Sequence, residues 1–111
     1  MTMLNITILR KTMHELGFAE SLRGTRLLVQ AAQMHAENPD RMLTKEVYPA
    51  IGRAAGLTAG QVERNIRSAI SDAVSCCGDH ETSLAWRRFM GGQNPTNGEV
   101  IARLAGFVDA D

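Results

Sequence analysis

The stretch at residues 58–75 limits the fold more than any other, because its apolar residues recur with the period of an α-helix. At 100° per residue they gather on one side of a helical wheel. These residues are Val62, Ile66, Ala69, Ile70 and Ala73. Thr58 is a suitable N-cap, and Gly56 ends the helical segment before it. Two helices joined by a short glycine-containing turn have the layout of a helix-turn-helix.

The start of the helix before this turn has two interpretations. Thr44 is a plausible N-cap, but Pro49 would then lie inside the helix, where it removes a hydrogen bond and clashes one turn back. Either the helix bends at Tyr48-Pro49, or it begins at Pro49 after a preceding short turn.

The rest of the chain also favours helices. We expect them over residues 5–17, from a Ser21 cap to the turn at Asn38-Pro39-Asp40, over 81–90, and after Thr96, which forms a capping box pattern with Glu99. Only five of the 111 residues are aromatic, so the core must be mainly aliphatic, which suits packed helices. The sequence predicts one all-α domain over residues 1–111, a compact bundle of about six helices containing a helix-turn-helix.

The outer face of the 58–75 helix carries side chains that can read DNA. Arg64, Ser68 and Ser71 lie opposite the apolar face, with Gln61 and Arg67 on the flanks. Arginine pairs with guanine, and Gln or Asn with adenine, in the major groove, where recognition helices use their first turns. An exposed face with two arginines is equally typical of a helix that only meets solvent, so spacing alone leaves both interpretations open.

Charge and composition exclude several classes of function. The formal net charge is zero, which argues against a strong unspecific nucleic-acid binder. Residues 41–75 nevertheless hold five Arg or Lys against three acids, and residues 76–111 hold three against five. No apolar run is long enough for a membrane span, and the chain does not start with the pattern of a secretory signal. Because the two cysteines, Cys76 and Cys77, are adjacent and cannot form a disulfide framework, we expect a reducing cytoplasmic location.

The chain shows no catalytic constellation, and we expect no enzyme, cofactor or metal site. Neither His14-Glu15 nor His80-Glu81 extends to the zinc motif His-Glu-x-x-His. Gly91-Gly92 lacks the Lys-Ser/Thr of a phosphate loop. An enzymatic interpretation would rest only on the adjacent cysteines and the scattered histidines. Trp86 and Phe89 are expected in the core rather than as a stacking platform.

Four segments resemble a known family in the right order. Residues 58–70, Thr-Ala-Gly-Gln-Val-Glu-Arg-Asn-Ile-Arg-Ser-Ala-Ile, resemble the recognition helix of the C-terminal effector domain of the stage zero sporulation transcription factor. Residues 14–17, 44–49 and 95–99 resemble the end of the first helix, the entry to the helix-turn-helix and the start of the last helix of that family. The resemblance covers about residues 4–108 and needs almost no gaps.

The resemblance implies a six-helix transcriptional regulator that binds a short DNA box, often in tandem copies. Glu63, Arg64 and Arg67 match DNA-contacting or adjacent positions, and the loop before the last helix lies near DNA in the family. The predicted DNA-binding residues are Thr58, Gln61, Glu63, Arg64, Asn65, Arg67, Ser68, Gln93 and Asn94. Double-stranded DNA is the expected partner, with RNA polymerase as a candidate protein partner. Self-association on DNA would use the last helix, with Val100, Ile101, Leu104 and Val108, although this is also an ordinary core face.

The chain departs from the family pattern at several positions where the family has a cationic side chain. Gln61 replaces a common arginine, Ser68 replaces a common histidine, and the loop at residues 91–94 lacks the family's lysines. Each lost cation removes a phosphate contact, so we expect weaker binding or a different box. The full-length family protein also has an N-terminal phosphoacceptor receiver domain, and nothing in residues 1–111 resembles it. We therefore expect either an excised effector domain or a stand-alone relative without control by phosphorylation. These departures keep one alternative open, a protein-interaction module that retains the fold but has lost specific DNA binding.

Overall fold

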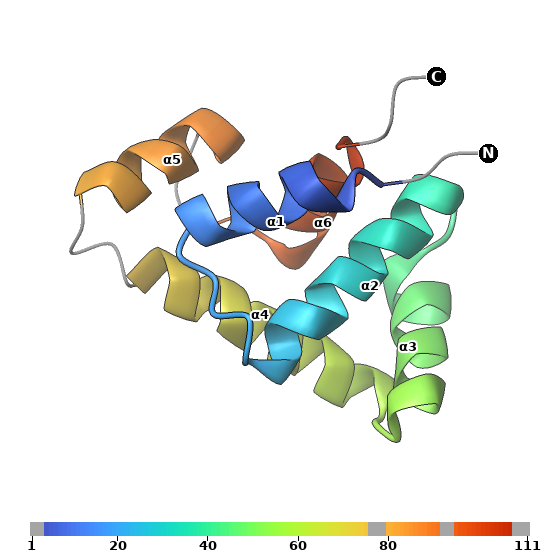
Figure 1. Cartoon of the computed structure of the whole chain (residues 1–111). Helices are drawn as coiled ribbons and strands as arrows, with labels where there is room; N and C mark the ends of the chain where they lie inside the picture. The colour runs from blue at the N-terminus through green and yellow to red at the C-terminus, as the bar shows by residue number, and fades with distance from the viewer. Residues whose placement is uncertain (1–3, 76–79, 92–94, 108–111) are drawn as a thin grey trace.

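The computed structural model describes residues 4–75, 80–91 and 95–107, and these form six α-helices and one π-helical turn (Figure 1). The elements are α1 (Ile6–Glu15), α2 (Arg23–Glu37), η1 (Leu43–Val47), α3 (Tyr48–Ala55), α4 (Ala59–Ser75), α5 (His80–Met90) and α6 (Asn97–Ala105). The predicted all-α bundle of about six helices, with α3 and α4 as its helix-turn-helix, is confirmed. Among the described residues, no helix combines the length and apolarity needed to cross a membrane.

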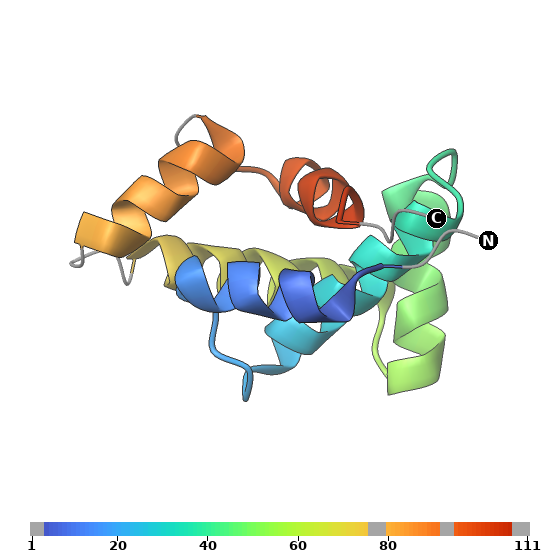
Figure 2. The same ribbon diagram turned by 45° about the horizontal axis from the view of Figure 1, so that its top comes forward.

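Helix α2 is the central element of the bundle. It packs against both α4 and α6, and α3 packs against α4 (Figures 1 and 2). The backbone of α2 touches that of α4 where Gly24 meets the carbonyl group of Asn65, and a β-carbon on Gly24 would overlap this carbonyl. Gly24 therefore sets how closely α4 approaches α2.

The core is aliphatic, as its composition predicts. Its fully buried large side chains are Leu9, Leu16, Leu28, Val47, Val62, Ile66, Val100, Ile101 and Leu104. Burying one such side chain stabilises the fold by roughly 1.5–3 kcal/mol. The predicted apolar face of α4 is buried throughout, and Val100, Ile101 and Leu104 of α6 also belong to the core. Val108 lies outside the described residues, and so do Cys76 and Cys77.

Two predictions of helix starts need correction. Ser21 does not cap the second helix: α2 starts at Arg23, and the residue before it, Leu22, makes no side-chain capping bond. Thr44 does not cap the third helix either, because it lies within η1, where the Met42 carbonyl accepts hydrogen bonds from the backbone N–H groups of Glu46 and Val47. Pro49 then falls in the first turn of α3, where no helical hydrogen bond is lost. A short turn does precede the helix, as the second interpretation has it, but α3 begins at Tyr48 rather than at Pro49 and follows η1 directly.

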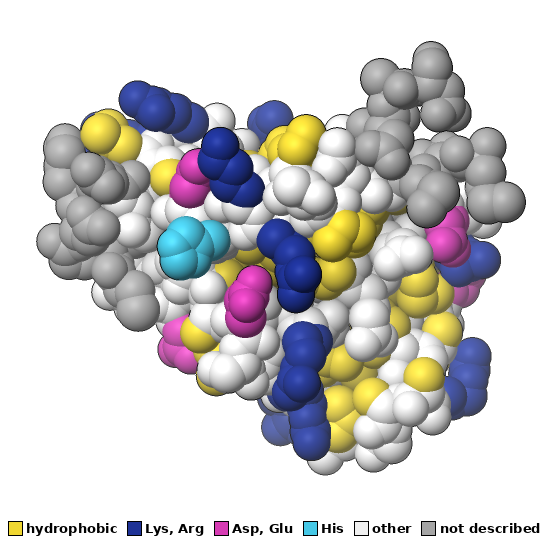
Figure 3. All heavy atoms as spheres, viewed as in Figure 1, with side chains coloured by type: hydrophobic (Ala, Val, Ile, Leu, Met, Phe, Trp, Pro, Cys, Tyr) yellow, Lys and Arg dark blue, Asp and Glu magenta, His cyan; other side chains and the backbone are white. Residues whose placement is uncertain are grey.

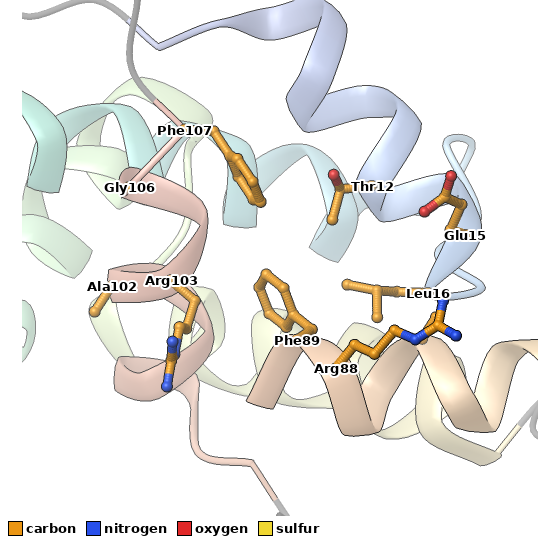
Figure 4. Close-up of a pocket in the computed structure, with 10 residues that line it drawn as sticks. Thr12, Glu15, Leu16, Arg88, Phe89, Ala102, Arg103, Gly106 and Phe107 are labelled. Atoms are coloured by element: carbon orange, nitrogen blue, oxygen red, sulfur yellow. The ribbon is translucent and has the colours of Figure 1, made fainter. Parts of the chain in front are cut away.

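Helix α5 is held to α1 and α6 mainly by aromatic rings. The Trp86 indole is buried, and its Nε1–H donates a hydrogen bond of 2.8 Å to the Leu16 carbonyl at the end of α1. Ring centroids are 5.8 Å apart for Phe18 and Trp86, 6.0 Å for Trp86 and Phe89, and 6.4 Å for Phe89 and Phe107. Figure 4 shows Phe89 and Phe107 side by side at a hollow of about 600 Å³ between α1, α5 and α6. The prediction that Trp86 belongs to the core is confirmed.

Candidate nucleic-acid interface

The turn between α3 and α4 is fixed by its backbone. Gly56 has φ +72°, a left-handed conformation that residues with a β-carbon rarely adopt, and it ends α3 as predicted. The backbone N–H of Leu57 donates to the Gly52 carbonyl over 2.8 Å. A β-carbon on Gly52 would overlap the Leu57 carbonyl, so glycine is required for this close approach. The two glycines together define the angle at which α4 leaves the turn.

A reciprocal capping box starts α4. The backbone N–H of Gln61 donates to Thr58 Oγ1 over 3.1 Å, and the backbone N–H of Thr58 donates to Gln61 Oε1 over 2.9 Å. Thr58 is therefore the N-cap that the sequence predicts. Gln61 also has a structural role that sequence reasoning missed, although Gln three residues after Thr is the signal for it. A bidentate contact of Gln61 with adenine would require the side-chain oxygen to leave the cap.

The exposed face of α4 has Arg64 near its centre. Arg64 and Ser68 are exposed, opposite the buried side chains of Val62 and Ile66. Arg64 Nε lies 3.4 Å from the Gly60 carbonyl, a long hydrogen bond along its own helix. The guanidinium group is thus directed along the first turns of α4, which are the turns that recognition helices use for base contacts.

Arg67, on the same face of α4, forms an ion pair with Glu63. Its Nη1 lies 2.9 Å from Glu63 Oε1, and 62% of the Arg67 side chain and 34% of the Glu63 side chain are exposed. Exposed pairs four residues apart on a helix contribute only about 0.3–0.5 kcal/mol. A DNA phosphate can therefore displace Glu63 from Arg67 at small cost, while the carboxylate limits the positive charge of the free protein.

Asn65 lies on the side of α4 that faces α2 rather than at the centre of the exposed face. Its Nδ2 donates to the Gln61 carbonyl over 2.7 Å, and its own carbonyl touches Gly24. Asn65 is half-buried, unlike Arg64 and Ser68, which are exposed.

Helix α6 is tied to α4 by Asn97, which sequence reasoning did not select. Asn97 Nδ2 lies 3.1 Å from the Glu63 carbonyl and 3.4 Å from the Tyr48 hydroxyl oxygen. One side chain at the start of α6 thus contacts both helices of the helix-turn-helix. The only sequence signal was its position directly after the capping residue Thr96, whose capping box with Glu99 is confirmed.

Tyr48 remains protonated at neutral pH in this arrangement. Burial raises the pKa of its phenol, the hydrogen bond from Asn97 lowers that pKa, and the Glu63 carboxylate raises it. Burial is the largest of these effects, and the pKa lies above its ordinary value. The phenol is therefore a neutral hydrogen-bonding group beneath the exposed face of α4.

The start of α6 also borders the exposed face of α4. A hollow of about 280 Å³ lies between the second half of α4 and this segment, and Arg67, Ser71 and Pro95 are in its lining. Gln93 and Asn94, the predicted loop contacts, lie outside the described residues. The described part of the chain has no group of three or more His, Cys, Asp or Glu side chains placed to hold a metal ion.

Comparison with known families gives one match that spans most of the chain. Residues 9–108 match the family described as "Sporulation initiation factor Spo0A C terminal". The match covers the whole helix-turn-helix and both helices that flank it.

Proposed function

Since this chain belongs to the Spo0A C-terminal family of DNA-binding transcription factors in sporulation, we propose that it acts as a single DNA-binding domain with α4 in the major groove. The family is one of transcription factor domains and not of enzymes, in agreement with the sequence prediction. In this proposal Arg64 reads base edges, and Arg67 contacts a phosphate or a base after leaving Glu63. Thr58, Gln61, Glu63, Asn65 and Ser68, with Gln93 and Asn94 from the loop, complete the interface.

The observation that carries this proposal is the exposure of Arg64 on a helix whose start is held rigidly. The turn glycines and the Thr58–Gln61 capping box fix the first turns of α4, and its opposite face is buried. When an arginine on such a helix binds, only its side chain must become ordered, because the backbone that carries it is already fixed.

The charge distribution indicates modest, salt-dependent binding. The chain has no net charge, and Glu63 partly neutralises Arg67. Few phosphates are then neutralised, so the dependence of affinity on salt is shallower than for a strongly basic domain.

We propose that neighbouring copies of the chain bind tandem DNA boxes and so raise the occupied fraction of these boxes. RNA polymerase is the proposed protein partner, and the cytoplasm the proposed location. Val100, Ile101 and Leu104 are not available for the self-association, because they are buried in the core.

The Arg64→Ala variant tests the reading role. Fluorescence anisotropy against the preferred duplex and single-base variants of it should show a loss of about 1–3 kcal/mol in binding, with relaxed preference at one position. Arg87→Ala is the matched control, because Arg87 is also exposed but lies on α5. Unchanged affinity and preference in Arg64→Ala would remove Arg64 from the interface. If no duplex is bound better than its scrambled sequence, the protein-interaction module is the better interpretation.

A further inference from the structure

A second hollow lies between α1 and α2, away from the exposed face of α4. It has a volume of about 520 Å³, within the range of roughly 300–1,000 Å³ that is usual for small-molecule sites. Four of its ten lining residues are apolar, namely Ile6, Met13, Phe18 and Val29. Ile6 is 43% exposed although it belongs to the apolar face of α1. We call this feature the α1–α2 hollow.

One buried polar group lies in the lining of the α1–α2 hollow. Thr25 is 5% exposed, and its hydroxyl group makes no hydrogen bond to any described residue. A buried hydroxyl group is normally bonded, because its desolvation is otherwise uncompensated. Its oxygen atom is also closed to solvent, so the Thr25 side chain must rotate toward the hollow before it can bond an oxygen atom of a ligand there.

Cationic side chains border the α1–α2 hollow from both helices. Arg10 comes from α1 and Arg26 from α2, and Glu20 is the one acidic residue in the lining. Arg10 Nε lies 3.8 Å from Glu20 Oε1, with 68% and 75% of these two side chains exposed, so the pair is weak. Figure 3 shows Lys or Arg side chains over α1 and α2 with hydrophobic side chains beside them. The combination suits a ligand with an apolar body and a single negative charge.

We propose that the α1–α2 hollow binds a small amphiphilic carboxylate. The apolar chain lies on Met13, Phe18 and Val29, and the carboxylate lies between Arg10 and Arg26. It accepts a hydrogen bond from Thr25 once that side chain has rotated toward the hollow. The site is separate from DNA binding, so each proposal can fail without the other. Thr25 directly follows Gly24, whose backbone touches α4, so the ligand lies next to the α2–α4 contact.

Octanoate and the uncharged octanamide are the probes, titrated into the full chain by calorimetry and by amide chemical-shift mapping. Octanoate should bind saturably, shift the amides of Met13, Phe18, Thr25 and Val29, and bind about tenfold more tightly than octanamide, since a hydrogen bond to a charged group is worth about 1.5 kcal/mol. Arg26→Ala should weaken octanoate about tenfold, and Thr25→Val, which keeps the side-chain shape, should also weaken it.

The neighbouring hollow of Figure 4 supplies the control. Arg88→Ala removes the same charge from the hollow between α1, α5 and α6 and should leave octanoate binding unchanged. Absence of saturable binding, equal binding of octanoate and octanamide, or a loss in Arg88→Ala with none in Arg26→Ala would overturn the proposal. Unchanged binding in Thr25→Val would overturn the role of the hydroxyl group.

Discussion

The helix-turn-helix and α5 are held in the same bundle by different kinds of contact. The helix-turn-helix depends on backbone approach at Gly24 and Gly52 and on polar contacts from Thr58 and Asn97. Helix α5 depends on the rings around Trp86. Backbone contacts fix the orientation of a helix without using its outer side chains. Ring packing supplies apolar burial within the core. Damage to α5 should therefore reduce stability, whereas damage to the helix-turn-helix should also reduce DNA binding.

The largest effect is expected for Trp86→Ala. Loss of the indole should lower the free energy of unfolding by about 3–5 kcal/mol, because a large buried ring and its hydrogen bond to Leu16 are both lost. Denaturant titration measures this change. At low temperature, the molecules that remain folded should bind DNA with the same dissociation constant as the wild-type chain. Trp86→Phe is the milder companion variant, which stays folded, and a weaker affinity in that variant would contradict the separation of the two regions.

Gly24→Ala should come next. The added β-carbon overlaps the Asn65 carbonyl, so α2 and α4 must move apart at a cost of about 1–3 kcal/mol. Gly60→Ala is the matched control, because its β-carbon would have only Thr58 Oγ1 nearby at 4.0 Å. That control should stabilise the chain by about 0.4–1 kcal/mol. Thermal unfolding of both variants measures the difference, and equal stabilities would show that the close α2–α4 approach is not required.

Asn97→Ala should weaken DNA binding by more than its loss of folding stability explains. Two hydrogen bonds to the helix-turn-helix are removed, at about 0.5–1.5 kcal/mol each, and α4 is no longer tied to α6 through the Glu63 carbonyl. Thr96→Ala is the control, since it costs about 1 kcal/mol through the α6 cap without touching α4. Anisotropy should show weaker DNA binding for Asn97→Ala with an unchanged salt slope. Equal affinities in the two variants would reduce Asn97 to a stabilising residue.

The smallest change in stability is expected for Gln61→Glu. A carboxylate at this position can still accept the hydrogen bond from the Thr58 N–H and suits a helix N-terminus, so the free energy of unfolding should change by less than about 0.5 kcal/mol. DNA affinity should nevertheless fall, because in the proposed complex the new charge would face the phosphates. Urea unfolding and anisotropy on the same sample separate the two effects. Wild-type affinity would place Gln61 outside the interface.

Most of the fold was predictable because periodicity and capping are local properties. The apolar set from Val62 to Ala73, the Thr58 cap and the Thr96–Glu99 box are each encoded within a few residues. The contact of Gly24 with Asn65 was not predictable, because it depends on which segments meet in space. Asn97 was missed for the same reason, since its acceptors are 34 and 49 residues away in the sequence.

The central claim is that the exposed face of α4 reads a DNA sequence. The most direct test is selection of duplexes from a random pool by the purified chain, with Arg64→Ala in parallel and anisotropy of the enriched duplex across a salt series. The account predicts enrichment of one short box, preferred over its scrambled sequence at every salt concentration, with one position relaxed in Arg64→Ala. Failure to enrich any box, with equal weak binding of all duplexes that disappears near physiological salt, would contradict it.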